Sequence, residues 1–103
     1  MSPPTVEAVE AALREVIDPE LGYNIVDLGL IYDVAIDERG AVAIVMTTTS
    51  PGCPATAALE EGARACAALV PGAAGVDVQM VWQPRWTPAR MSAEAKQHFG
   101  VES

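Results

Sequence analysis

The alternation of side chains from Ile31 to Thr48 constrains the fold of this chain more than any other feature. Apolar residues occupy every second position, and the polar run Asp37-Glu38-Arg39-Gly40 interrupts them. Period two is the repeat of a strand with one buried face, and a short polar turn that contains glycine joins two such strands. The pattern predicts a β-hairpin over residues 31–48. The residues expected on one face of its first strand are Tyr32, Val34 and Ile36.

Apolar residues at helical spacing predict a helix before this hairpin and another after it. The first covers residues 5–17, with Thr5 as its N-cap, and ends at Asp18-Pro19 because a residue before proline is driven out of the helical region. The second covers residues 54–70 and stops at Pro71-Gly72. Between the first helix and the hairpin, residues 18–30 are expected to form a long non-helical connection.

The rest of the chain predicts one more strand and a short last helix. Alternation resumes after Gly75 and predicts a strand over residues 76–82. Ser92 can cap a helix over residues 93–99, with Gly100 as its stop. The order α-β-β-α-β-α predicts an α+β sandwich, with helices on one face of a small mixed sheet that contains the hairpin.

Length and charge exclude several classes of protein. The 103 residues predict one domain, 1–103, and the 50% of hydrophobic residues exclude general disorder. A formal charge of -8 repels phosphate backbones and anionic membranes, so neither nucleic acid nor a membrane is an expected partner. The first ten residues have neither the basic nor the apolar region of a signal peptide, and we therefore expect a cytoplasmic protein.

The cysteine at the start of the second predicted helix is the first candidate for chemistry. Cys53 stands between Gly52 and Pro54, and Pro54 suits the first helical position, which predicts Cys53 at or near the N-cap. Free backbone N–H groups and the helix dipole there favour a thiolate, the form that attacks or binds metal. Thr49 and Ser50 bring hydroxyl groups beside it. The alternative is that Cys53 is a small buried residue and that these hydroxyls are strand-end chemistry.

Three carboxylates precede the hairpin and form the second candidate group. Asp18, Glu20 and Asp27 would share a pocket with Cys53 if the connection folds over the start of the second helix, and could then supply oxygen ligands or position a proton. An equally good interpretation is that they are only turn formers and caps.

The remaining candidates have simpler explanations. Cys66 falls on the apolar stripe of the second helix, too far from Cys53 for a disulfide, and is expected in the core. Trp82 and Trp86 alternate with prolines and either close the core or form a docking surface for a protein. His98 suits a solvated helix end, and a Cys53–His98 hydrolase has weak support. With two cysteines and one histidine, a four-ligand zinc site within one chain is nearly excluded.

Several motifs together give the chain a family resemblance. They are Asp18-Pro-Glu20-Leu-Gly22, Ile25-Val-Asp27-Leu-Gly29-Leu-Ile-Tyr-Asp33-Val, Met46-Thr-Thr-Thr-Ser-Pro-Gly-Cys53-Pro54, Trp86-Thr-Pro88 and Met91-Ser92. With these motifs the chain resembles the SufT and PaaD-like family of metal–sulfur cluster biosynthetic proteins, over about residues 6–100.

The resemblance implies a small α+β iron–sulfur assembly domain that helps client proteins mature and has no established turnover. Matched position by position, the family's presumed site falls on Asp18, Glu20, Leu21, Thr49, Ser50 and Cys53, with Asp27 as a further candidate. Ser50 stands where such proteins often have Thr.

The resemblance also sets expectations for cargo and partners. PaaD-like proteins that accompany a multicomponent oxygenase acting on an aromatic acyl-CoA have further C-terminal cysteines in their longer members, and this sequence has none, which favours the SufT-like role. An iron–sulfur cluster is normally held by four thiolate or imidazole ligands. We therefore expect a transient iron–sulfur cluster or iron, held through Cys53 of one chain or of both chains of a homodimer, and completed by a client or by glutathione-like thiols. The expected partners are the assembly machinery and client apoproteins. The alternatives are a protein-interaction adaptor and an oxygenase accessory subunit.

Overall fold

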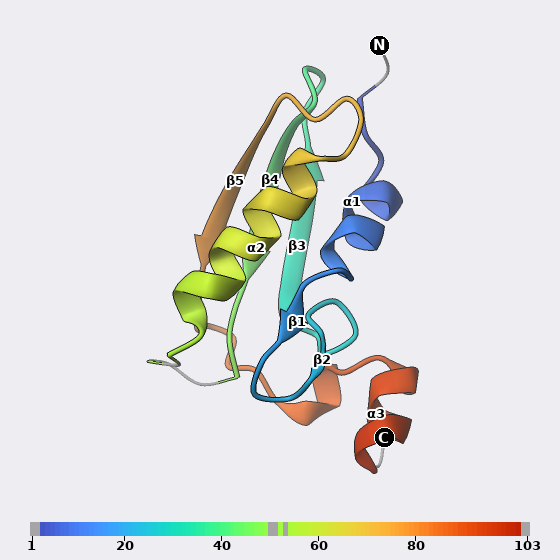
Figure 1. Cartoon of the computed structure of the whole chain (residues 1–103), viewed down its shortest axis with the longest axis vertical. Helices are drawn as coiled ribbons and strands as arrows, with labels where there is room; N and C mark the ends of the chain where they lie inside the picture. The colour runs from blue at the N-terminus through green and yellow to red at the C-terminus, as the bar shows by residue number, and fades with distance from the viewer. Residues whose placement is uncertain (1–2, 50–51, 53, 102–103) are drawn as a thin grey trace.

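The fold is an α+β arrangement of helices beside two small sheets, as predicted (Figure 1). The computed structural model describes residues 3–49, 52 and 54–101. The elements are α1 (Val6–Leu13), β1 (Ile17–Asp18), β2 (Tyr23–Asn24), β3 (Ile31–Ile36), β4 (Ala41–Met46), α2 (Thr56–Ala68), β5 (Gly75–Met80), the 3-10 turn η1 (Pro88–Arg90) and α3 (Ala93–Phe99). The two-residue strands β1 and β2 and the turn η1 were not predicted. No described helix is long and apolar enough to cross a membrane.

The main sheet has the order β3-β4-β5 and is mixed, as predicted. The hairpin strands β3 and β4 are antiparallel, whereas β4 and β5 are parallel. Parallel neighbours need a crossover, and α2 provides it. Both strands therefore end at the same edge of the sheet, and α2 begins at that edge (Figure 1).

Alternation decides which face of the sheet is covered. On β4, Val42, Ile44 and Met46 are buried, while Ala41 and Ala43 are exposed. The buried side chains pack against a helical layer whose buried residues are small or branched, as the shortage of aromatic residues requires. In α1 and α2 these are Val9, Leu13, Leu59, Ala63 and Ala67.

A β-bulge changes the predicted face of one residue. The pairing of β3 with β4 shifts register between Ile31 and Asp33, so that an extra residue, Tyr32, faces no partner directly. Ile31 then packs on the core with Val34 and Ile36. The Tyr32 hydroxyl instead donates to the carbonyl of Pro84 at 2.7 Å.

Helix α1 begins where predicted and ends earlier. The Thr5 hydroxyl accepts from the Ala8 N–H at 3.1 Å and caps the helix. The predicted end at residue 17 is wrong, because the helix stops at Leu13 and Ile17 joins β1 in extended conformation. Ile17 is 51% exposed and does not belong to the buried stripe.

Helix α2 begins later than predicted, at Thr56. Its N-cap is Ala55, which has no side chain able to cap, while Pro54 lies in the preceding turn. The prediction of Pro54 as the first helical residue is therefore wrong, and the N-cap is two positions after Cys53 in the sequence. The predicted stripe is also rotated, since Leu69 is 83% exposed.

The chain after β5 packs against the loop before β3 and ends in α3, which was predicted. The Ser92 hydroxyl caps α3 by accepting from the Ala95 N–H at 3.2 Å, and Gly100 ends it with a φ of 71°. The Ser92 N–H donates to the carbonyl of Asp27 at 2.7 Å. The same segment packs so closely on Gly29 that a Cβ there would lie under 3.0 Å from the carbonyl oxygen of Arg90.

This contact predicts the effect of adding one methyl group. Gly29 has a φ of 79°, so Gly29→Ala meets both left-handed strain and a backbone collision, and we expect a loss of about 3 kcal/mol. Gly22→Ala is the matched control, because its φ is 68° but a Cβ there has nothing within 4 Å. Strain alone should cost about 1 kcal/mol. Urea unfolding measures both, and equal losses would contradict the close docking of Arg90 on Gly29.

Candidate functional site

The segment between β4 and α2 is the candidate functional site. It leaves the carboxyl end of β4 at Thr47 and reaches the N-terminus of α2 at Thr56, at the edge of the sheet where β5 also ends (Figure 1). Such a junction exposes the first backbone N–H groups of the helix. Cys53 and Ser50 belong to this segment but lie outside the described residues. Thr49 is described and half-buried.

Two buried threonines anchor the start of this segment. Thr47 and Thr48 have 0% and 1% of their surfaces exposed. The Thr47 N–H donates to the carbonyl of Leu30 at 2.9 Å, which continues the sheet beyond β4. The indole N–H of Trp82, just past β5, donates to the Thr48 hydroxyl oxygen at 3.1 Å. The ends of the two parallel strands are thus joined by a side-chain hydrogen bond, which no local sequence pattern could indicate.

Asp18 organises the turn that follows β1. Its carboxylate is 1% exposed and accepts from the backbone N–H groups of Glu20 at 2.8 Å and Leu21 at 3.3 Å. Its carbonyl accepts from the N–H of Gly22 at 2.7 Å. These are the bonds of a turn-forming aspartate. Of the two interpretations of Asp18, the structure therefore shows the turn former, and Glu20 is exposed on the same turn.

The turn at Asp18–Gly22 lies at the same end of the molecule as the start of α2 (Figure 1). Just before it, the chain passes close to α2, since a Cβ on Gly62 would lie 3.2 Å from a methyl group of Val16. Leu21, in the turn, packs against the core, as does Ala55, the N-cap of α2. This turn and the start of α2 therefore lie at the same end of the molecule.

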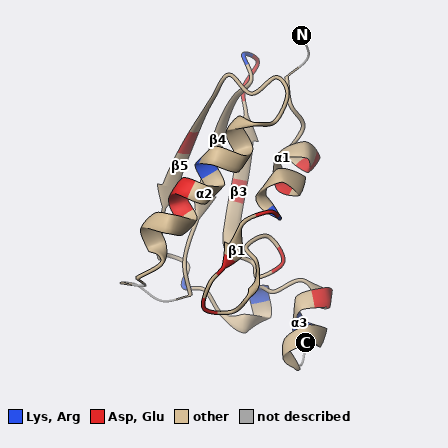
Figure 2. Ribbon diagram, in the orientation of Figure 1, with Lys and Arg blue, Asp and Glu red and all other residues tan. Residues whose placement is uncertain are grey.

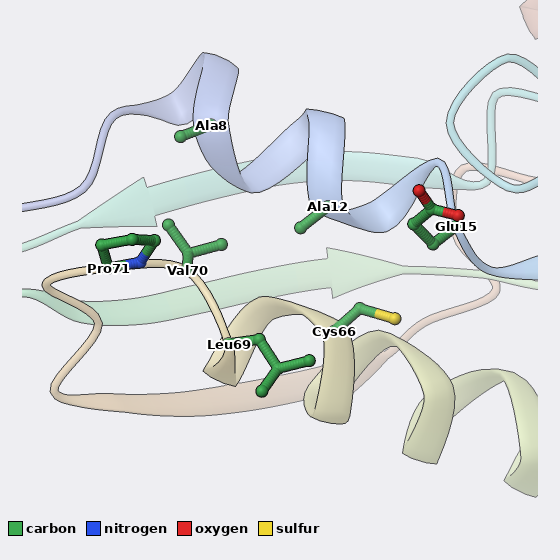
Figure 3. Close-up of a pocket in the computed structure, with 7 residues that line it drawn as sticks. All are labelled: Ala8, Ala12, Glu15, Cys66, Leu69, Val70 and Pro71. Carbon is green, nitrogen blue, oxygen red and sulfur yellow. The ribbon is translucent and has the colours of Figure 1, made fainter.

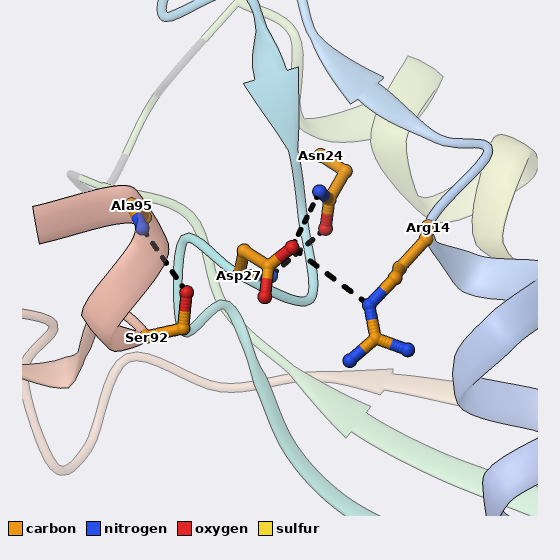
Figure 4. Close-up of polar contacts among 5 residues, drawn as sticks. All are labelled: Arg14, Asn24, Asp27, Ser92 and Ala95. Atoms are coloured by element: carbon orange, nitrogen blue, oxygen red, sulfur yellow. Dashed lines mark hydrogen bonds and ion pairs between the residues drawn. The ribbon is translucent and has the colours of Figure 1, made fainter. Parts of the chain in front are cut away.

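Asp27 takes part in a different set of contacts (Figure 4). Its carboxylate accepts from the Asn24 side-chain amide at 2.8 Å and lies 3.7 Å from the Nε of Arg14. Its carbonyl accepts from Ser92. Asp27 thus connects α1 with α3. Within the described part of the chain, no three His, Cys, Asp or Glu side chains are grouped to hold a metal ion. Asp18, Glu20 and Asp27 therefore make no metal site by themselves.

The other sequence candidates have structural contacts of their own. The Trp86 indole N–H donates to the carbonyl of Leu28 at 2.8 Å, and its ring packs on the core, so this tail closes the core. The rings of His98 and Tyr23 are 4.9 Å apart. Cys66 is half-buried and a free thiol, and it lines a groove between α1 and α2 (Figure 3). It packs against the core, as predicted, but is only partly buried.

Comparison with known proteins decides the family. The model of the iron–sulfur cluster assembly protein family matches residues 6–80, nearly three quarters of the chain. The chain belongs to this family. The matched range contains β1 to β5 and every candidate site residue, whereas Trp82, Trp86 and α3 lie beyond it. The predicted resemblance to SufT-like proteins is therefore confirmed.

Similar proteins support the same assignment. The chain is 43% identical to the Fe-S protein maturation auxiliary factor YitW of Bacillus subtilis, over 93% of this chain and 94% of that protein. It is 43% identical to the Fe-S protein maturation auxiliary factor SufT of Staphylococcus aureus, over 84% of this chain and 98% of that protein. A crystal structure of a domain of unknown function from Bacillus anthracis superposes with a TM-score of 0.87 at 41% identity, covering 93% and 92% of the two chains.

The turn-forming role of Asp18 predicts how its variants behave. Asp18→Ala removes the acceptor of two backbone N–H groups in a buried position, and should cost about 2 kcal/mol. Asp18→Asn keeps an oxygen acceptor and should cost less than about 1 kcal/mol. Chemical denaturation of the two variants and the wild type provides the measurement. Should both variants be as stable as the wild type, Asp18 would not hold this turn.

Proposed function

We propose that this family member delivers iron–sulfur cargo to client proteins through the thiolate of Cys53. The role in iron–sulfur cluster assembly follows from the family and from relatives that are maturation factors. The proposal adds the reactive residue and the direction of delivery. Cluster or iron is the cargo of this protein, and the protein acts as an assembly factor without catalytic turnover of a small substrate, in the cytoplasm.

The proposal is supported most directly by the position of Cys53 in the sequence, in the segment that joins β4 to α2. The residue lies three positions before Thr56, the first residue of α2, and follows a strand end fixed by Thr48 and Trp82. The first turn of α2 contains no acidic residue, so no helix carboxylate neutralises its positive end. A positive helix end favours a thiolate over a thiol.

The chain's own thiols favour transient handling of the cargo over storage. Iron–sulfur clusters take about four protein ligands. Cys66 cannot join Cys53, because it lies ten residues beyond the start of α2, about 15 Å along the helix. A second protein must therefore complete the coordination, either a client apoprotein or a second copy of this chain. Incomplete ligation makes transfer to a client with more ligands favourable.

The residues around Cys53 have supporting roles in this proposal. Asp18 holds the turn that lies at the same end of the molecule as the start of α2, and Glu20, exposed on that turn, has the role of assisting Cys53. Thr49 and Ser50 supply hydroxyl groups in the segment that contains Cys53. Asp27 is a positioning residue, since its contacts are with Arg14, Asn24 and Ser92.

The alternative of a docking surface at Trp82–Pro88 loses support. Both indole N–H groups are used inside the molecule, and both rings are half-buried. No observation favours the accessory role in an aromatic acyl-CoA oxygenase.

The proposal predicts a difference between the two cysteines. In a strain deleted for this protein, a copy with Cys53→Ser should fail to restore the activity of an iron–sulfur dehydratase, whereas Cys66→Ser should restore it. Both substitutions exchange a thiol for a hydroxyl, so Cys66→Ser is the matched control. Immunoblots must show equal protein levels. Normal client activity with Cys53→Ser would overturn the thiol's role and leave the family assignment intact.

A further inference from the structure

A groove of about 290 Å³ lies between α1 and α2, away from the Cys53 segment (Figure 3). Ala8 and Ala12 line it from α1, and Cys66 and Leu69 from α2 and its end. The alanine methyl groups leave the space open, while Val9 and Leu13 on the adjacent face of α1 fill the core. This volume is at the lower limit of ligand pockets, about 300 Å³, and suits a few side chains better than a whole cofactor.

The lining of this groove is apolar and partly exposed. Leu69 is 83% exposed at the end of α2. Burying a leucine side chain stabilises a complex by about 1.5–3 kcal/mol. Among the described residues that line the groove, Glu15 alone is charged.

The charge around the groove is negative. Five glutamates and two arginines lie in α1, in the two residues that follow it, and in α2 (Figure 2). Both arginines are already paired, Arg14 with Asp27 and Arg64 with Glu60 and Glu61. The last turn of α2 has no basic residue, so its carbonyl end adds negative potential there.

These features select one kind of occupant. A second copy would bring two negative faces together, and a nucleic acid or an anionic membrane would be repelled. A partner segment with apolar side chains on one face and Lys or Arg beside them would fill the groove and pair with Glu15. An amphipathic helix that docks in a groove has this arrangement.

We propose that the α1–α2 groove binds a basic amphipathic helix of a partner protein. The inference does not rest on Cys53, because none of the described residues between β4 and α2 lines the groove. Helix α2 then has two functional ends: its N-terminus follows the reactive thiol, and its C-terminus forms the partner surface.

A synthetic helix of leucine and lysine at amphipathic spacing is the probe, and the matched peptide has glutamate in place of lysine. Titration of the ¹⁵N-labelled full chain should shift the amide signals of Ala8, Ala12, Cys66 and Leu69 with the lysine peptide and leave them unchanged with the glutamate peptide. Leu69→Ser should weaken binding about tenfold and Glu15→Gln about threefold. Ile17→Ser is the control, since Ile17 is also an exposed apolar residue but does not line the groove.

Three outcomes would overturn the inference. They are shifts spread evenly over the sheet face, equal weakening by Ile17→Ser and Leu69→Ser, and equal binding of the two peptides. Sedimentation of the protein alone provides a further check. If it dimerises and Leu69→Ser abolishes the dimer, the occupant is a second copy and the proposed partner is wrong.

Discussion

The parallel pairing of β4 with β5 is the constraint on which the rest of the structure depends. Parallel strands cannot be joined by a tight turn, so the chain must cross the sheet, and α2 is that crossover. The crossover places the segment that contains Cys53 at the edge where both strands end. The hydrogen bond from Trp82 to Thr48 then ties the two strand ends together. The candidate site is thus a consequence of topology as much as of its own residues.

The chain after β5 packs against the loop before β3, at the end of the sheet where β4 and β5 both end. Trp86 reaches the carbonyl of Leu28, and the chain near Arg90 packs so closely on Gly29 that no side chain fits there. The Ser92 N–H then bonds to Asp27, which is paired with Arg14. Helices α1 and α3 and the loop before β3 are therefore held together by contacts that converge on Asp27, a residue that the sequence also suggested for chemistry.

Much of the fold could be predicted from the sequence because its signals are local. The hairpin follows from alternation, and α3 follows from Ser92 and Gly100. The errors lie where pairing with another segment overrides local preference or where the local signal fits two structures equally well. Ile17 fits a helical stripe but pairs with Asn24 in extended conformation.

In α2, alanine occurs on every face, so hydrophobicity could not fix which side is buried. The start of α2 was misplaced because Pro54 suits a helix start equally well as a preceding turn. The residues of the candidate site stay a prediction from the sequence, whereas the bond from Trp82 to Thr48 could not be predicted, because it spans 34 residues and leaves no local signal.

The central claim is that Cys53 holds iron–sulfur cargo for transfer, and anaerobic reconstitution tests it most directly. An apoprotein client would be incubated with ferric iron, a thiol reductant and sulfide in the presence of wild type, Cys53→Ser or Cys66→Ser, then separated and analysed for iron, sulfide and visible absorption. Wild type and Cys66→Ser should speed the appearance of a cluster chromophore in the client, and Cys53→Ser should not. Equal loading of the client with Cys53→Ser would contradict the proposed role of the thiol.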